Sequence, residues 1–416
     1  MAKKEKTNAT APMDDFDKLL GSVEKEFGAV YSGEEAAIQD EYIQLDAPRL
    51  AWAYGGALKL NAIHRLNGKE SGGKTTLATY LSGQCQKRKF EKEGNYNNAH
   101  VIIVDNEHTF DVKHAKDLGL ILNDPTTGKP LVHILRNKYV EDQCAAWEKI
   151  VESGRICASI YDSDAAAINK AEFDNEIGKA NFGAGAKANG VVIKRMNWYV
   201  DTYKTPLFWI SQERANQELM AHLPKPTGGE AVNFYPSTRF RVTPKEFITK
   251  SGEIVGITMK IKNYKNKTGI PFRECLLDVY FKDGPDYQHG INGEGQYLDM
   301  LLELGIIAQH GGWYYLWEDQ PDKMVKMQGW GGVQNWFKEH PDVFQEFKVL
   351  VNDKMSGYDA ALDKNTVEVD EEAEFQKEQL EEKAKREAAV AAVVDAAKDA
   401  DAEPEDSHGG EEITEE

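Results

Sequence analysis

The sequence predicts an α/β fold with a mainly parallel central sheet, on the strength of three observations. Short apolar runs typical of strands alternate with segments of helical periodicity between about residues 60 and 211, which is the pattern of βαβ units. A glycine-rich loop lies between the first of these runs and the helical segment after it. From about residue 237 apolar and polar residues alternate and turn at Ser251 and Gly252, which indicates hairpins added to the sheet.

The chain has 416 residues, enough to bury a substantial core in one large domain or in two or three smaller ones. It has no apolar run of about 18 residues, and its first residues, MAKKEKTNATAPMDD, lack the apolar stretch of a secretory signal. Four cysteines without CxxC spacing argue against a zinc site or a disulfide framework. We therefore expect a cytoplasmic protein that does not bind membranes.

The net charge of −19 is unevenly distributed. Residues 367–416 carry 19 acidic and 5 basic side chains, whereas the rest of the chain carries 50 acidic and 45 basic ones. The body of the protein is thus nearly balanced and has room for local basic grooves. The overall acidity therefore does not exclude nucleic acid as a partner.

The elements can be predicted in chain order. A short amphipathic helix is expected over 14–30, where apolar residues recur at helical spacing. A polar, glycine-punctuated connector is expected from there to about residue 60. The predicted strands are NAIHRL (61–66), HVIIVD (100–105), ASIYD (158–162) and PLFWIS (206–211).

The chain divides into five predicted parts. A shift toward glycine and aspartate near 284–295 marks the end of the core, and the compact aromatic stretch 296–355 suffices for a small helical domain with a hairpin. The Ala/Glu/Lys-rich stretch 379–400 favours a helix in an otherwise disordered tail. The parts are a disordered leader (1–13), an N-terminal helix and linker (14–45), the core (46–285), a small C-terminal domain (286–360) and an acidic, partly helical or disordered tail (361–416).

The stretch NGKESGGKTT (67–76) fits the motif G-x-x-x-x-G-K-[ST]. Glycines let consecutive backbone N–H groups converge on a polyphosphate, and the following helix adds its positive N-terminal end. The lysine is expected to reach the β and γ phosphates and the threonine hydroxyl to bind Mg²⁺. An accidental glycine-rich turn is the alternative, but a strand precedes the loop and a helix follows it. The predicted ATP-contacting residues are Gly68, Lys69, Glu70, Ser71, Gly72, Gly73, Lys74, Thr75 and Thr76.

Acidic residues follow two of the predicted strands. Asp105 and Glu107 come at the end of VIIVDNEH, and Asp162 ends ASIYD. Ligands gather at the carboxyl ends of parallel strands, and a phosphate-binding loop needs partners for Mg²⁺ and for the attacking water. Each acid could equally cap the next helix, so the residues alone leave both interpretations open.

Separated segments along the chain carry a further signal. They are LGSVEKEFGA, GKESGGKTT, VDNEHTFDVKHAKDLGL, IYDSDAA, AEFDNEIG, FWISQER, PTGGEAVNFYPSTRFRV, KNKTGIPFRE and LLELGII with GGWYYL and NWFKEHP. Together these segments resemble the RecA recombinase family, including bacterial RecA and the UvsX-like recombinases of bacteriophages. The likeness runs from about residue 14 to 355 in the family's order, and it implies a RecA-type P-loop ATPase core, an N-terminal subunit-docking helix and a small α+β C-terminal domain.

The resemblance implies a role for individual nucleotide-site residues. Glu107 would polarise the attacking water, and Asp162 would hold Mg²⁺ through water. Asp111 and His114 would contact the adenine. With Lys74, the implied catalytic set is Glu107, Gln212, Lys265 and Lys267.

Three of these residues have more distant roles. Gln212 would sense the γ-phosphate and relay its presence to a DNA-binding segment. Lys265 and Lys267 would reach the ATP of a neighbouring subunit and supply positive charge there. From the residues alone, the two lysines read equally well as a solvated hairpin tip.

Two segments correspond to the family's DNA-binding loops. Basic residues interleaved with glycine can follow a phosphate backbone, aromatic rings can stack on bases, and apolar side chains can wedge between them. Without the resemblance, a lid closing over ATP would explain the second segment as well, because it also carries Glu213 and Glu218. The candidates are Lys179, Phe182, Lys187, Arg214, Asn216, Met220, Lys225, Gly228 and Gly229.

The resemblance implies a DNA-dependent ATPase that forms filaments on single-stranded DNA and pairs it with a homologous duplex. ATP and Mg²⁺ are the implied cofactors. Single- and double-stranded DNA, further copies of the chain and single-strand-binding or loading proteins are the implied partners. A hexameric RecA-fold helicase is one alternative, against which the N-terminal helix and C-terminal segment argue. An ATP-binding filament scaffold without turnover is the other, and the presence of both Lys74 and Glu107 argues against it.

Overall fold

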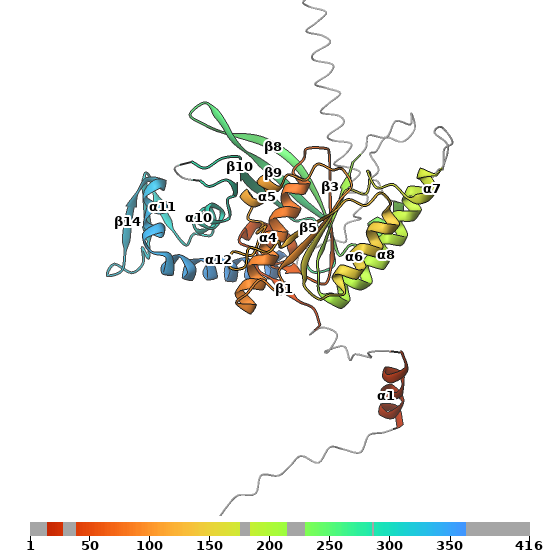
Figure 1. Cartoon of the computed structure of the whole chain (residues 1–416). Helices are drawn as coiled ribbons and strands as arrows, with labels where there is room; N and C mark the ends of the chain where they lie inside the picture. The colour runs from red at the N-terminus through yellow and green to blue at the C-terminus, as the bar shows by residue number, and fades with distance from the viewer. Residues whose placement is uncertain (1–14, 28–38, 175–183, 214–228, 285–286, 363–416) are drawn as a thin grey trace, which may run out of the picture.

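A computed structural model of the chain describes residues 15–27, 39–174, 184–213, 229–284 and 287–362. Within these residues, the centre of the molecule is a nine-stranded sheet with the order β11-β10-β9-β8-β3-β7-β6-β4-β5 (Figure 1). The strands from β8 to β5 pair in parallel, and β9, β10 and β11 add antiparallel. The predicted fold class is confirmed. The strands are β3 (Ile63–Gly68), β4 (His100–Asp105), β5 (Val132–Leu135), β6 (Ile156–Asp162), β7 (Leu207–Gln212), β8 (Thr238–Lys250), β9 (Glu253–Asn266), β10 (Glu274–Tyr280) and β11 (Gly290–Ile291).

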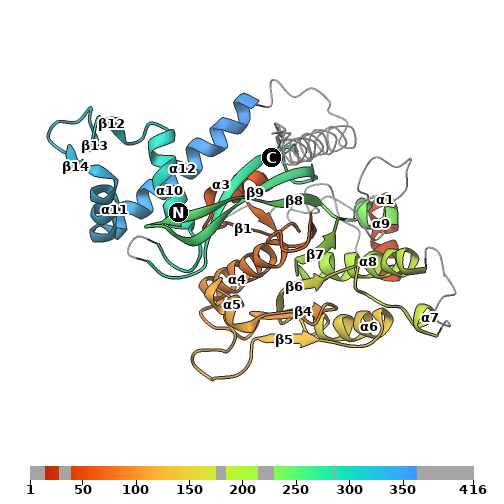
Figure 2. The ribbon, with the colours of Figure 1, turned by 90° about the horizontal axis from the view of Figure 1, so that it is seen from above.

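Helices cover both faces of the parallel strands (Figure 2). Successive strand residues point to opposite faces, so Ile103 joins one buried cluster with Leu77 of α4, and Ile102 joins another with Trp147 of α6. The glycine-rich loop connects the carboxyl end of β3 to the first residue of α4. The helices are α3 (Pro48–Tyr54), α4 (Lys74–Glu93) and α5 (Val112–Asp117) on the first face, and α6 (Val140–Val151), α8 (Ala184–Tyr203) and α9 (Gly229–Phe234) on the second, with α7 (Lys170–Phe173) before α8.

The predicted strands agree with the observed ones within two residues at each end. All residues of β3 and β6 are buried, because helices cover both faces of these central strands. The hairpin of β8 and β9 turns where predicted, with Ser251 and Gly252 at φ 50° and 83°. This long hairpin extends beyond the parallel strands (Figure 1).

The predicted connector before residue 60 is wrong in its second half. Residues 48–54 form α3, which begins at a proline and ends at Gly55 in the left-handed conformation, φ 98°, as is common for helix termini. Strands β1 (Tyr42–Ile43) and β2 (Leu58–Lys59) flank it as an antiparallel pair. Leu50 and Tyr54 are buried in the main core. Elements this short show too few turns for hydrophobic periodicity to reveal them.

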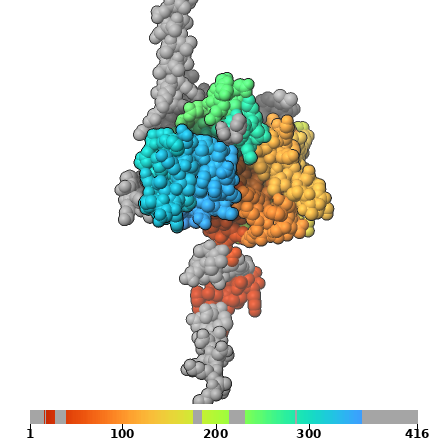
Figure 3. All heavy atoms as spheres, turned by 90° about the vertical axis from the view of Figure 1, so that its left-hand side faces the viewer, coloured from red at the N-terminus to blue at the C-terminus, as the bar shows by residue number. Residues whose placement is uncertain are grey.

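A small α+β unit follows the sheet. It has its own buried cluster, which includes Leu301, Leu316, Val333 and Val351. Figure 3 shows it as a compact teal and blue body against the side of the core. The predicted hairpin is in fact a three-stranded antiparallel sheet. The elements are α10 (Gly293–Glu303), β12 (Ala308–His310), β13 (Trp313–Leu316), β14 (Val325–Gln328), α11 (Gly329–Glu339) and α12 (Pro341–Leu362).

The predicted N-terminal helix is present as α1 (Asp15–Phe27). It lies apart from the sheet in Figure 1, and Phe16 and Leu19 on its apolar stripe are 62% and 54% exposed. Its predicted last residues, 28–30, lie outside the described part of the chain, as do the leader and the tail beyond residue 362. Among the described helices, none is both long and apolar enough to cross a bilayer.

Candidate active site

The loop between β3 and α4 has the geometry of a phosphate cradle. Gly68 has φ 155°, and a Cβ atom there would lie 2.3 Å from the carbonyl oxygen of Val242. Gly73 has φ 88°, and a Cβ atom there would lie 2.2 Å from the sulfur of Met259. Both motif glycines are therefore required by close neighbours and by backbone conformation. Helix α4 begins at Lys74, directly after the loop, so its free N–H groups face the space above the loop.

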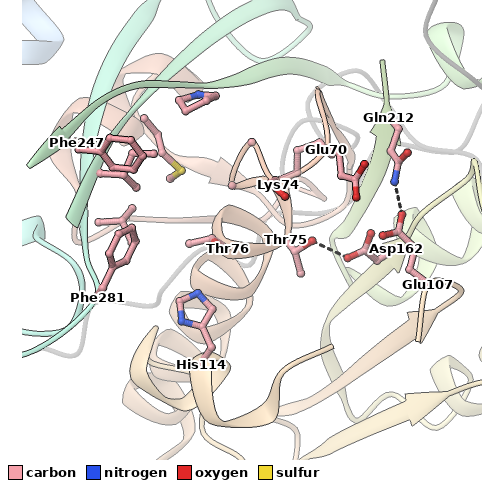
Figure 4. Close-up of a pocket in the computed structure, with 17 residues that line it drawn as sticks. Glu70, Lys74, Thr75, Thr76, Glu107, His114, Asp162, Gln212, Phe247 and Phe281 are labelled. Carbon is pink, nitrogen blue, oxygen red and sulfur yellow. Dashed lines mark hydrogen bonds between the residues drawn. The ribbon is translucent and has the colours of Figure 1, made fainter. Parts of the chain in front are cut away.

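The threonine of the motif and the acid at the end of β6 are hydrogen-bonded. Thr75 Oγ1 donates to Asp162 Oδ2 at 2.7 Å (Figure 4). Burial raises the pKa of Asp162 to about 6, with the hydrogen bond from Thr75 opposing that shift. A hydroxyl beside a carboxylate is the oxygen donor set that Mg²⁺ accepts from proteins.

Thr75 and Asp162 by themselves would fill only part of the coordination shell of Mg²⁺. Within the described residues, no group of three or more His, Cys, Asp or Glu side chains is placed to hold a metal ion. Thr75 and Asp162 therefore fit Mg²⁺ only in the way typical of nucleotide sites, where phosphates and waters complete the shell.

Lys74 is the cation of the cradle. Its side chain is buried, and Nζ donates to the carbonyl oxygen of Lys69 at 2.6 Å. Burial lowers the pKa of Lys74, and the nearby carboxylates of Asp162 and Glu107 oppose this. The ammonium is thus held inside the loop, where a polyphosphate would replace the backbone carbonyl as its partner.

Glu107 is hydrogen-bonded to two residues that lie at the ends of neighbouring strands. Its Oε1 accepts hydrogen bonds from Ser163 Oγ at 2.5 Å and from Gln212 Nε2 at 2.6 Å. Glu107 follows β4, Ser163 follows β6 and Gln212 ends β7, so the residues meet because β4, β6 and β7 are parallel neighbours. A carboxylate anchored in this way beside a phosphate cradle is positioned to orient water.

Asp105, the third acid at a strand end, has a different position. It is 2% exposed and accepts hydrogen bonds from Arg136 Nε at 2.9 Å and Nη2 at 2.7 Å. The backbone N–H groups of Thr109 and Phe110 also donate to it. Asp105 therefore holds the turn after β4, while Glu107 and Asp162 face the cradle.

A cavity of about 500 Å³ lies over the loop and the start of α4. Residues 70–76 of the loop line one side, with Glu107, Asp162 and Gln212 beside them (Figure 4). Gly68 and Lys69, which were also predicted to contact ATP, are not among the described residues that line this cavity. The far wall is apolar and comes from the hairpin and the end of β10, with Phe247, Ile257, Met259 and Phe281.

The aromatic wall was missed by sequence reasoning. Phe247 on β8 and Phe281 after β10 are 63% and 46% exposed, and both line the cavity together with His114 (Figure 4). The sequence offered little to identify these two rings as part of a binding site. Single aromatic residues are common on protein surfaces. Their distance from the loop in sequence hid the relationship.

The two predicted adenine contacts have different positions. His114 lines the cavity, and burial lowers the pKa of its imidazole. The described residues that line the cavity do not include Asp111. Asp111 is instead the N-cap of α5, where it accepts from the backbone N–H groups of Lys113 at 2.8 Å and His114 at 3.1 Å. It therefore positions His114 through the helix start.

Lys265 and Lys267 lie far from the cradle of their own chain. Thr238 at the start of β8 pairs with Asn266 at the end of β9 and with His64 near the start of β3. The two lysines therefore lie at the amino end of β3, whereas the phosphate loop follows its carboxyl end. Lys265 Nζ donates to the carbonyl oxygens of Asn233 and Phe234 at 3.0 Å each, and Lys267 Nζ donates to that of Phe234 at 3.3 Å. One chain cannot bring these lysines to its own cavity.

Most predicted DNA contacts lie outside the described residues. Lys187 is exposed on α8, and Gly229 is the first residue of α9. The start of the second segment is anchored, because the buried Glu213 carboxylate pairs with Arg241 at 3.1 Å. The residues outside the described part are Lys179, Phe182, Arg214, Asn216, Met220, Lys225 and Gly228.

The sheet order, the glycine loop and the oxygen-lined cavity define a P-loop nucleotide-binding protein. The chain belongs to the RecA family: the family model described as RecA N-terminal domain matches residues 15–286. Protein RecA of Syntrophus aciditrophicus is 30% identical over 338 residues, 79% of this chain and 89% of that protein. Protein RecA of Lactobacillus acidophilus is 30% identical over 361 residues, 84% and 89% of the two chains.

A third relative, Protein RecA of Halalkalibacterium halodurans, is 29% identical over 348 residues, 81% of this chain and 90% of that protein. The similarity thus spans most of both partners in each comparison. The family predicted from the separated segments is confirmed.

Proposed function

We propose that the chain is a DNA-dependent ATPase that forms ATP-bound filaments on single-stranded DNA and promotes homologous pairing and strand exchange. The observation that carries the proposal is the hydrogen bond between Glu107 and Gln212 beside the cradle. It joins a carboxylate placed for hydrolysis to the strand end from which a proposed DNA-binding segment departs. Membership of the RecA family supports the same activity.

The chain's own residues account for each part of ATP hydrolysis. The loop N–H groups and Lys74 would hold the phosphates, and Thr75 and Asp162 would hold Mg²⁺. When bound, Mg²⁺ would neutralise charge on the phosphate oxygens. Glu107 would orient the attacking water, and the adenine would lie beside His114 and the ring of Phe281, both of which line the cavity.

Gln212 would couple nucleotide to DNA. Its amide lies in the cavity and donates to Glu107, so a γ-phosphate in the cradle would offer it a competing acceptor. A shift of this side chain would be felt by residues 213–228, which follow directly. We propose that DNA contacts come from this segment and the start of α9, and from the segment that leads into α8 together with the first turns of α8, through the nine candidate residues predicted from the sequence.

A second copy of the chain would complete each ATP site. Lys265 and Lys267 lie at the opposite end of the sheet from their own cradle, and Leu19 on the apolar stripe of α1 is 54% exposed. Exposed apolar stripes mark interaction surfaces. We propose that α1 docks on a neighbouring subunit and that the two lysines reach a neighbour's ATP, so that activity requires a filament.

The remaining partners follow from the same activity. Double-stranded DNA is the pairing substrate, and single-strand-binding or loading proteins are proposed to assist assembly. The cytoplasm, or the host cytoplasm for a phage-encoded chain, is the proposed compartment. All four cysteines are buried and free, which suits a reducing environment.

The test is ATP hydrolysis with and without single-stranded DNA, combined with electron microscopy. Strong stimulation by DNA and open helical filaments would support the proposal. Hydrolysis indifferent to DNA would remove the recombinase function, closed rings would support the hexameric helicase, and ATP binding without turnover would support the scaffold.

A further inference from the structure

A row of polar and charged side chains crosses the interior of the sheet next to the active site. Arg65 on β3 and Ser211 on β7 are 0% exposed, and Asp164 after β6 is 3% exposed. Burying charge is costly unless each group finds a partner. The three side chains are joined by hydrogen bonds into one buried set. Its fourth member is Asn233 of α9, which is partly buried.

The hydroxyl of Ser211 is the centre of this set. Ser211 Oγ donates to Asp164 Oδ2 at 2.6 Å and accepts from Arg65 Nε at 3.0 Å. Trp209 Nε1 donates to the same Asp164 oxygen at 3.0 Å. Arg65 also donates through Nη1 to the side-chain oxygen of Asn233. Burial lowers the pKa of the Arg65 guanidinium to about 10, and the Asp164 carboxylate opposes that shift.

One end of the set reaches the hydrolytic carboxylate. Asp162, Ser163 and Asp164 are consecutive and each bonds a different part of the site. Asp162 bonds Thr75 of the loop, Ser163 bonds Glu107, and Asp164 bonds Ser211. A displacement of the Asp164 side chain therefore acts on its neighbour Ser163, and through it on Glu107.

The other end reaches the elements that flank both proposed DNA-binding segments. Ser211 directly precedes Gln212, and Asn233 lies in α9, on the far side of residues 214–228. The side-chain amide of Asn189 in α8, which follows residues 175–183, donates to the carbonyl oxygen of Asp164 at 3.0 Å. Asp164 is thus linked directly to α8 and β7 and, through Ser211 and then Arg65, to α9.

We propose that Asp164, Ser211 and Arg65 are positioning residues that transmit DNA occupancy from α8 and α9 to Glu107. This inference rests on the proposed function. In the described part of the chain, the cavity is lined by other residues, so these three act through Glu107 and Gln212 and not on the nucleotide. A buried network transmits displacement well because each hydrogen bond in it is expensive to leave unmade.

The test compares Ser211→Ala and Asn233→Ala with a matched control, Ser159→Ala. Ser159 is also a 0% exposed serine, on the neighbouring strand β6, and its hydroxyl accepts one hydrogen bond, from Trp147 Nε1 at 3.0 Å. For each full-length protein, hydrolysis is measured without DNA and with saturating poly-dT. DNA binding and thermal unfolding are measured beside it.

We expect Ser211→Ala and Asn233→Ala to keep DNA-free hydrolysis but to lose about threefold to tenfold of the stimulation by poly-dT, the range expected for coupling residues. Ser159→Ala should be stimulated like the wild type. Asn233→Asp, which keeps an acceptor for Arg65, should restore stimulation relative to Asn233→Ala.

Full stimulation of both alanine variants would overturn the inference. Equal loss in Ser159→Ala would also overturn it, since packing alone would then explain the effect. If Ser211→Ala does not fold, the partly exposed Asn233 site decides. If poly-dT does not stimulate ATP hydrolysis by the wild-type protein, the proposed function itself is contradicted. That outcome is distinct from a loss of stimulation seen only in the variants.

Discussion

The side-chain amide of Gln212 donates a hydrogen bond of 2.6 Å to Oε1 of Glu107. The two residues lie at the ends of β7 and beyond β4, strands that are separated by β6 in the sheet. Ser163 after β6 donates to the same oxygen. The orientation of Glu107 therefore depends on both neighbours, and a ligand that draws Gln212 away changes it.

Glu107→Gln should slow hydrolysis strongly and leave ATP binding intact. The amide keeps the shape and can still accept from Gln212, but it cannot act on water as a carboxylate does, so we expect a loss of about 10²–10⁴-fold in kcat. Hydrolysis and nucleotide binding are measured separately. Glu91→Gln, at a surface pair with Arg88, is the control, and a Glu107→Gln rate near that of the control would contradict the assigned role.

Thr75→Val should raise the Mg²⁺ requirement. The substitution preserves side-chain shape but removes the hydroxyl that bonds Asp162, so we expect the Mg²⁺ concentration for half-maximal hydrolysis to rise about 10-fold. Titration of Mg²⁺ at fixed ATP measures this. Thr202→Val on α8 removes a hydroxyl that bonds only a helix carbonyl and should change nothing. An unaltered Mg²⁺ curve for Thr75→Val would exclude the threonine as a ligand.

Phe281→Ala should weaken ATP binding through loss of the proposed contact with the adenine. Base stacking on an aromatic ring contributes about 1–3 kcal/mol, so KM for ATP should rise about 10-fold while kcat at saturation changes little. Steady-state kinetics separate the two constants. Phe90→Ala removes another exposed ring, which stacks on Tyr96 away from the cavity, and serves as the control. A KM that does not move would place the adenine elsewhere.

Mixing two inactive variants should restore activity if Lys267 acts across an interface. A Lys267→Ala chain keeps its own cradle and Glu107, and a Glu107→Gln chain keeps its lysine. Mixed filaments would contain junctions where an intact cradle meets an intact lysine, so hydrolysis should exceed that of either variant alone. Mixing Lys267→Ala with the double variant Lys267→Ala/Glu107→Gln should restore nothing. Equal rates in both mixtures would show that the lysine acts within its own chain or not at all.

His64 should make the protein acid-sensitive. It is 0% exposed on β3, with Nδ1 2.8 Å from Thr238 Oγ1 and Nε2 2.8 Å from the carbonyl oxygen of Lys59, and burial lowers its pKa to about 4. The unfolded chain binds this proton below about pH 6.5 and the folded chain only near pH 4, so acidification between these values favours unfolding. The shift corresponds to about 3 kcal/mol.

Denaturant unfolding at several pH values measures this effect. His64→Gln, which cannot gain a proton in this range, should flatten the pH dependence of the free energy of unfolding. A variant with the same slope as the wild type would assign the acid sensitivity to other groups.

The sequence predicted the parallel strands β3, β4, β6 and β7 well, but it missed the parallel strand β5 and the shorter elements before β3. Strand β4 was predicted to the residue because four consecutive β-branched residues, 101–104, are followed directly by an acid. Helix α3 and the β1–β2 pair were missed because elements of seven and two residues carry almost no periodicity. They are stabilised by the core against which they pack, and the sequence around them does not reveal that core.

The sequence by itself determined the phosphate loop and the family. The residues of the loop are consecutive in the chain, and the segments that resemble the family occur in the family's order. The tertiary structure added the positions of the acids: among the described residues, Glu107 and Asp162 line the cavity and Asp105 does not. Asp105 and Glu107 are two residues apart, yet one faces Arg136 and the other Gln212. The aromatic wall at Phe281 and the buried set around Ser211 were likewise decided by sheet order. Their members are brought together by hydrogen bonding between strands far apart in the chain, and no local pattern encodes that pairing.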